Sequence, residues 1–79
     1  MSATVLEMWQ DFERCVMSPG IGQIQRQEMR RAFYAGAMAA FVNIVQISSS
    51  GDQAVATAEL RALVRESEQY VRDLRDGKA

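Results

Sequence analysis

The stretch Gln23 to Ser48, which reads QIQRQEMRRAFYAGAMAAFVNIVQIS, decides the fold of this 79-residue chain. Residues 32–42 carry no charged or amide side chain, and only Asn43 and Gln46 interrupt the apolar run before Ile47. Two apolar rows run along it at helical spacing. They are Met29, Phe33, Gly36, Ala37, Ala40, Ile44 and Ile47 in one row, and Tyr34, Met38, Phe41 and Val45 in the other. Because one neighbouring helix covers only one row, the stretch predicts a helix that is covered on more than one side.

Small residues in the same stretch indicate close packing between helices. Ala32, Gly36 and Ala40 recur at every fourth position, so a neighbouring backbone can come near. A chain of this length forms one domain, residues 1–79, with a small core, for which oligomerisation is a common remedy. We therefore predict a homo-oligomer, a dimer or higher. The expected contact residues are Phe33, Gly36, Ala40, Phe41 and Ile44.

Capping and turn residues place three helices at about residues 5–17, 22–47 and 52–76. The tetrapeptide Thr4 to Glu7 has the form of a capping box, and Ser50 with Gln53 is a second such pattern that opens the third helix. Pro19 ends the first helix, because the residue before a proline avoids the α region. Since a short connection joins the two long helices, the predicted fold is all-α, with a short N-terminal helix laid across a long antiparallel hairpin.

The composition excludes several classes of function. A formal net charge of −1 with 24% charged residues fits neither a polybasic nucleic-acid arm nor an acidic disordered tail. One cysteine and no histidine remove a disulfide framework, the usual zinc spacings and the common hydrolytic triads. We expect no enzyme activity, no catalytic residue, no metal and no cofactor. Cys15, beside Trp9 and Phe12, is interpreted as a small buried hydrophobic residue.

The apolar run that ends at Ile47 also indicates where in the cell the protein is found. It is shorter than the roughly 20 apolar residues that cross a bilayer. Glu7, Asp11 and Glu13 fall where a signal peptide would need an apolar core. We therefore expect a cytoplasmic protein that does not enter the membrane.

A dense polar cluster precedes the apolar run. Arg26 and Arg30 lie four residues apart, as do Arg30 and Tyr34, so guanidinium groups and an aromatic ring come onto neighbouring strips of one helix. Such a strip could hold a phosphate bidentately or stack a base. The alternative interpretation is the solvated end of a helix, partly neutralised by Glu28. Both interpretations stay open, and the candidate residues for a ligand or partner are Arg26, Gln27, Arg30, Arg31 and Tyr34.

The run QEMRRAFYAG, residues 27–36, together with the W-x-x-F of Trp9 and Phe12 and the turn Pro19-Gly20, resembles small helical accessory proteins of tailed bacteriophages and prophages. Proteins of this group usually have no assigned function. The resemblance implies expression in the cytoplasm of an infected bacterium and a non-enzymatic accessory role.

Small phage proteins of this kind often act against host defence, so the resemblance implies two alternatives. In the first, the chain is an anti-defence or host-modulating inhibitor that binds a host protein through an oligomeric helical surface. In the second, it is a sponge that sequesters a phosphorylated nucleotide immune signal in inter-subunit arginine and tyrosine pockets. Neither alternative involves sequence-specific binding of nucleic acid.

Overall fold

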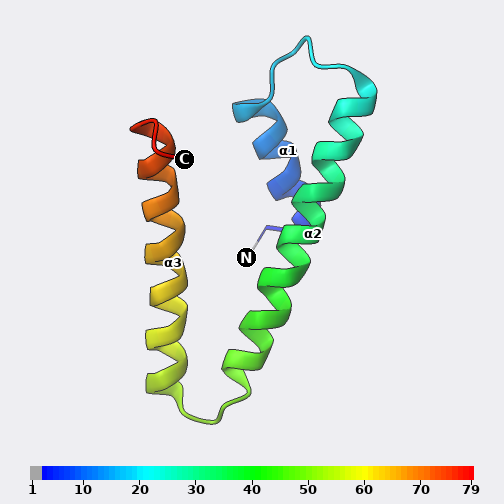
Figure 1. The fold of residues 1–79 in the computed structure, drawn as a ribbon. Coiled ribbons are helices and arrows are strands. Elements are labelled where there is room, and N and C mark those ends of the chain that lie inside the picture. Colours follow the sequence, from blue (N-terminus) through cyan, green and yellow to red (C-terminus); the bar gives the residue numbers. More distant parts are fainter. Residues whose placement is uncertain (1–2) are drawn as a thin grey trace. The chain divides into compact units, whose positions relative to one another are not determined.

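The computed structural model describes residues 3–79, and within them it contains three α-helices and no strand (Figure 1). Helix α1 spans Val5–Val16, α2 spans Gln23–Ser48 and α3 spans Gln53–Arg75. The predicted all-α class and the three predicted helices are confirmed, and each observed boundary lies within one residue of the predicted one. Among the described helices, none combines the length and the apolar character that crossing a membrane requires.

The contacts in the chain form two compact units, Met1–Phe41 and Val42–Ala79, which we call the N-terminal and C-terminal units. Helix α2 is continuous and belongs to both: its first 19 residues lie in the N-terminal unit and its last seven in the C-terminal unit. The antiparallel hairpin, the single domain and the oligomer stay predictions.

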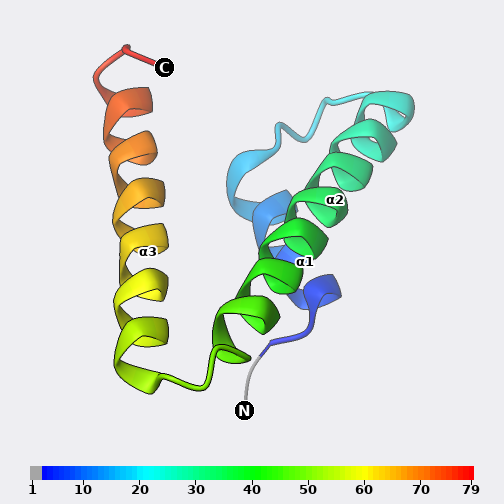
Figure 2. The same ribbon diagram turned by 60° about the horizontal axis from the view of Figure 1, so that its bottom comes forward.

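In the N-terminal unit, α1 lies beside the first half of α2 (Figures 1 and 2). The predicted capping box starts α1: the Thr4 hydroxyl accepts a hydrogen bond from the Glu7 backbone N–H at 3.1 Å, and the Glu7 carboxylate accepts one from the Thr4 backbone N–H at 2.9 Å. These bonds satisfy two backbone donors that the first turn of a helix leaves without partners. The helix ends at Val16, two residues before the Ser18-Pro19 peptide, as the restriction on the residue before a proline requires.

An aromatic cluster joins α1 to α2. Trp9 is 2% exposed, and its ring lies 5.7 Å from that of Phe12 and 5.5 Å from that of Phe33, measured between ring centres. The rings of Phe12 and Phe33 are 5.4 Å apart, which closes a triangle of mutual contacts. Distances of this size are typical of favourable aromatic pairs, and they make Trp9 the centre of the core of this unit.

Cys15 corrects one sequence-based interpretation. It is exposed, not buried. At about 100° per residue, Cys15 lies about 120° around the helix from Trp9, whereas Phe12 lies only about 60° away. The narrow contact between α1 and α2 covers the side of Phe12 and does not reach Cys15.

In the C-terminal unit, a turn joins the end of α2 to α3, and the second predicted capping box is wrong. The cap of α3 is Asp52, whose carboxylate accepts a hydrogen bond from the Val55 N–H at 3.1 Å. Gly51, with a φ of 82°, sits between Ser50 and the helix, so the serine is too early to cap it. The Ser50 hydroxyl instead accepts a weak bond from the Asp52 N–H at 3.4 Å, inside the turn.

The chain leaves α3 through a residue with a left-handed backbone conformation, for which glycine is best suited. Gly77 has a φ of 74°. The Lys78 N–H donates to the Asp73 carbonyl at 2.7 Å, and the Gly77 N–H donates to the Leu74 carbonyl at 3.2 Å. This is a Schellman motif, which satisfies carbonyl groups that the last turn leaves free.

Candidate functional site

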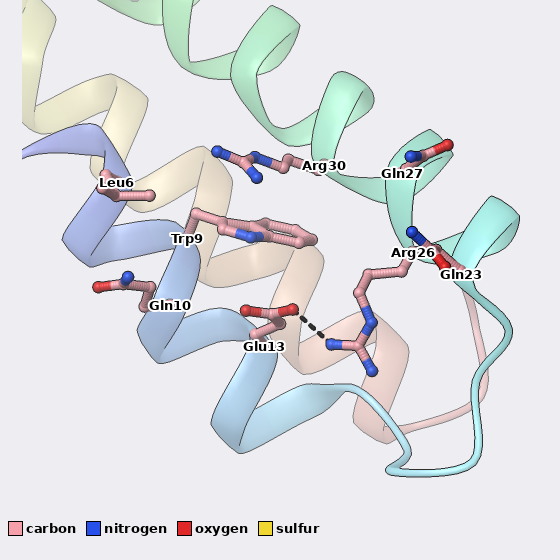
Figure 3. Close-up of a pocket in the computed structure, with 8 residues that line it drawn as sticks. All are labelled: Leu6, Trp9, Gln10, Glu13, Gln23, Arg26, Gln27 and Arg30. Atoms are coloured by element: carbon pink, nitrogen blue, oxygen red, sulfur yellow. Dashed lines mark hydrogen bonds and ion pairs between the residues drawn. The ribbon is translucent and has the colours of Figure 1, made fainter.

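The predicted polar cluster lies in the first turns of α2, where α1 faces it across a groove of about 260 Å³. Figure 3 shows Glu13 of α1 and Arg26 of α2 pointing toward each other, with the buried Trp9 indole lying between the two helices. The lining residues are Leu6, Trp9, Gln10 and Glu13 from α1, and Gln23, Arg26, Gln27 and Arg30 from α2. The aromatic cluster and an ion pair across the groove both join the two helices.

Arg26 is committed to a contact between the helices. Its guanidinium forms an ion pair with the Glu13 carboxylate of α1, and the two side chains are 37% and 26% exposed. Both groups are therefore partly withdrawn from water, which makes their attraction stronger than that of a fully exposed pair. Arg26 thus has a structural partner, and its charge is already matched. Glu13 was not among the predicted site residues, although its position four residues after Trp9 places it near the same face of α1.

Arg31 is also paired, but at the surface. Its guanidinium lies 3.0 Å from the Glu28 carboxylate, three residues earlier on α2, and both side chains are largely exposed. An exposed pair of this kind contributes about 0 to 1 kcal/mol. The contact shows that Glu28 neutralises part of the cluster, as the alternative interpretation of the sequence expected.

Arg30 differs from the other two arginines of the cluster. Among the described residues no carboxylate lies within 4.0 Å of its guanidinium, whose central carbon is instead 5.7 Å from the centre of the Tyr34 ring. A guanidinium over an aromatic ring at this distance is a cation–π contact. The Tyr34 ring in turn makes an edge-to-face contact with the Phe33 ring, with 6.3 Å between the ring centres, so the aromatic cluster supports the position of Arg30.

Four of the five predicted binding residues surround one open pocket of about 390 Å³ on the surface of α2. They are Gln27, Arg30, Arg31 and Tyr34. The fifth, Arg26, lines the neighbouring groove with Glu13 and does not line this pocket. Gln27 and Arg30 line both depressions, and of the cations in them Arg30 is the one without an ion pair among residues 3–79.

The five predicted oligomer contacts occupy different environments in the protomer. Phe33 packs in its own aromatic cluster. Gly36, Ala40, Phe41 and Ile44 are exposed, and a Cβ atom built on Gly36 would meet no atom within 4 Å. The second apolar row is also open to solvent: Met38 is 65% exposed and Val45 is 64% exposed.

Within residues 3–79 no group of three or more cysteine, aspartate or glutamate side chains could hold a metal ion. No protein family, curated protein or solved structure matches this chain. The geometry of the groove, the pocket and the exposed face of α2 is therefore the basis for assigning a function.

Proposed function

We propose that this protein is a non-enzymatic interaction protein that self-associates through α2 and docks on another protein. The observation that carries the proposal is an uncovered apolar face, which we call the α2 strip. It consists of Met38, Phe41, Val42 and Val45, all exposed. At about 100° per residue these four side chains lie within an arc of about 100°, so they form one continuous face.

A face of this kind is unfavourable in water. Large apolar side chains that stand alone on a surface are ordinary, but a contiguous row is typical of an interaction site. Residues 35–42 contain no charged or amide side chain that could solvate the strip from the same helix. Covering it with the apolar face of another helix would remove it from water and drive association.

A second copy of the chain is the most direct occupant. The formal net charge is only −1, so electrostatic repulsion between copies is weak. Two-fold symmetric dimers are the commonest closed assemblies, and in them one strip contacts the same strip of the partner.

The resemblance of residues 27–36 to phage accessory proteins defines the wider role in this proposal. The assembly acts in the cytoplasm of an infected bacterium as an inhibitor or accessory factor, and its target is a host protein. Inhibition by docking requires no catalytic group. The arginines and Tyr34 flank the strip and supply the residue types that are enriched at interface hot spots.

The test compares two glutamate variants of exposed α2 residues. Met38→Glu places a charge in the strip, whereas Asn43→Glu places the same charge about 140° around the helix. Light scattering should give the wild type and Asn43→Glu a multiple of the 8.8 kDa protomer mass, and Met38→Glu a mass near 8.8 kDa. Burying an unpaired carboxylate should weaken association at least about tenfold.

Two outcomes contradict the proposal. One is a wild type that is monomeric at micromolar concentration while circular dichroism shows intact helices. The other is equal dissociation by both variants, which would place the contact elsewhere on α2. A pull-down from bacterial lysate, with Met38→Glu beside the wild type, then tests whether partner binding needs the assembled strip.

A further inference from the structure

We propose that the pocket formed by Gln27, Arg30, Arg31 and Tyr34 binds a phosphorylated nucleotide. All four residues come from α2 of one protomer, so the site does not depend on the proposed self-association. The inference starts from the charge balance of the cluster, because the structure separates three arginines that look equivalent in the sequence.

Arg30 is the cation that remains available to a ligand. Arg26 is paired with Glu13, and Arg31 is paired with Glu28. Arg30 has no carboxylate within 4.0 Å among the described residues and stands over the Tyr34 ring. Its guanidinium also donates no hydrogen bond to another described residue, so its N–H groups are available to match two phosphate oxygens.

Arg31 can add a second contact. Its partner, Glu28, is exposed and only three residues away, so exchanging that contact for a phosphate costs little. The pocket therefore concentrates positive charge at one point, with Arg30 as the primary ligand and Arg31 as an exchangeable one.

An aromatic ring beside this charge narrows the class of anion. Tyr34 is half-buried and supported by Phe33, so its ring presents a fixed apolar surface. A purine or pyrimidine base can stack on such a ring or on the guanidinium plane above it. Gln27 offers both an amide donor and an amide acceptor to a base edge. Phosphate, base and amide contacts together describe a nucleotide better than a bare phosphate or a carboxylate.

The size of the pocket and the charge of the protein favour a small ligand over a nucleic-acid strand. The pocket of about 390 Å³ lies within the ordinary range for small-molecule sites. A strand requires a line of several cations along its backbone, whereas within residues 3–79 Arg30 is the one arginine of this pocket without an ion pair. With a formal net charge of −1, the protein also lacks the positive electrostatic field that is typical of nucleic-acid-binding proteins.

The binding experiment uses the full chain and three matched ligands for each base. Nucleoside diphosphates, the corresponding nucleosides and pyrophosphate are titrated, together with cyclic dinucleotides, and the arginine side-chain N–H signals are followed by NMR. A nucleoside diphosphate or cyclic dinucleotide should bind, shift the Arg30 signal and bind more weakly as ionic strength rises. Nucleosides should bind at least about tenfold more weakly, because they lack the charge-assisted hydrogen bonds.

The variants test each part of the pocket. Arg30→Gln should weaken nucleotide binding at least about tenfold, while Arg65→Gln, an exposed arginine of α3 without an ion pair among the described residues, should leave it unchanged. Tyr34→Leu should weaken binding about fivefold or more, whereas Tyr34→Phe, which keeps the ring, should bind like the wild type. Circular dichroism of each variant confirms that the helices are intact.

Four results would overturn the proposal. They are no binding by any nucleotide, equal binding by the wild type and Arg30→Gln, equal binding of nucleosides and nucleotides, and pyrophosphate bound as tightly as the nucleotides. A single-stranded oligonucleotide that binds more tightly than every nucleotide would also overturn it, in favour of a nucleic-acid surface. None of these results bears on the α2 strip, whose test is the molecular mass.

Discussion

The two units of the chain differ in how much of their surface they bury. The N-terminal unit contains Trp9 and Met17, both buried, and an aromatic triangle that spans two helices. The C-terminal unit buries only Ile47 among its described residues, and α3 buries none. Each unit contains one amphipathic helix, α1 or α3, so an amphipathic helix by itself does not produce a core.

The difference follows from side-chain size at the helix contacts. Large aromatic rings from α1 and α2 fill the space between those helices and each removes much apolar area from water. Helix α3 contains no phenylalanine or tryptophan, and its Val64, Tyr70, Val71 and Leu74 side chains remain exposed. The lesson is that the N-terminal unit carries its own core, whereas the C-terminal unit leaves apolar surface for further packing.

The largest expected effect tests this contrast directly. Trp9→Ala removes the centre of the aromatic cluster and should lower the free energy of unfolding by about 3–5 kcal/mol. Tyr70→Ala removes an aromatic side chain from an exposed position of α3 and should change it by about 0.5 kcal/mol or less. Urea unfolding followed by circular dichroism measures both. Equal losses would show that the two units have equally developed cores in solution.

A smaller effect shows whether α2 is covered in solution. Gly36 has open space where a Cβ would lie, and its φ is not positive. Gly36→Ala should therefore stabilise the helix by about 0.8–1.0 kcal/mol, the cost of glycine in a helix interior.

Gly36→Leu sharpens this test. On an uncovered helix the leucine variant should keep the mass and the melting temperature of the wild type or melt slightly higher. If a neighbouring copy packs closely at Gly36, as the small-residue spacing predicts, the leucine should instead lower both. The alanine and leucine variants together therefore show whether another copy of the chain contacts α2 at Gly36.

The smallest expected effect concerns the capping box at the start of α1, in the N-terminal unit. Hydrogen bonds from the Thr4 backbone N–H and hydroxyl hold the pKa of Glu7 below its ordinary value. Because this pKa is lower in the folded chain than in the unfolded chain, the capping box stabilises the fold above the ordinary glutamate pKa, and that contribution is lost as the pH falls through the lowered pKa. Wild type should melt slightly above Glu7→Gln at neutral pH, and the gap should close as the pH falls below the ordinary pKa of glutamate. A gap that widens on acidification would contradict this assignment.

The local features of the protein could be predicted from the sequence, because they depend on neighbours within a few residues. The three helices, the Thr4 capping box and the end of α1 before Pro19 all follow from short-range patterns. The grouping of Gln27, Arg30, Arg31 and Tyr34 was predictable for the same reason, since side chains three and four residues apart share one face of a helix. The cap of α3 was missed because Ser50 and Asp52 both have capping side chains, and the left-handed Gly51 between them excludes the serine.

Only the tertiary structure decided which side chains of those helical patterns are buried and which are ion-paired. Glu13 and Arg26 are 13 residues apart, and no local rule pairs them, yet their contact removes Arg26 from the pocket and leaves Arg30 as its unpaired cation. Trp9, Phe12 and Phe33 form one cluster while Cys15, on the same helix, stays exposed. The physical reason is that a helical pattern defines the faces a segment can present, whereas burial and pairing depend on how far the neighbouring helix extends over each face.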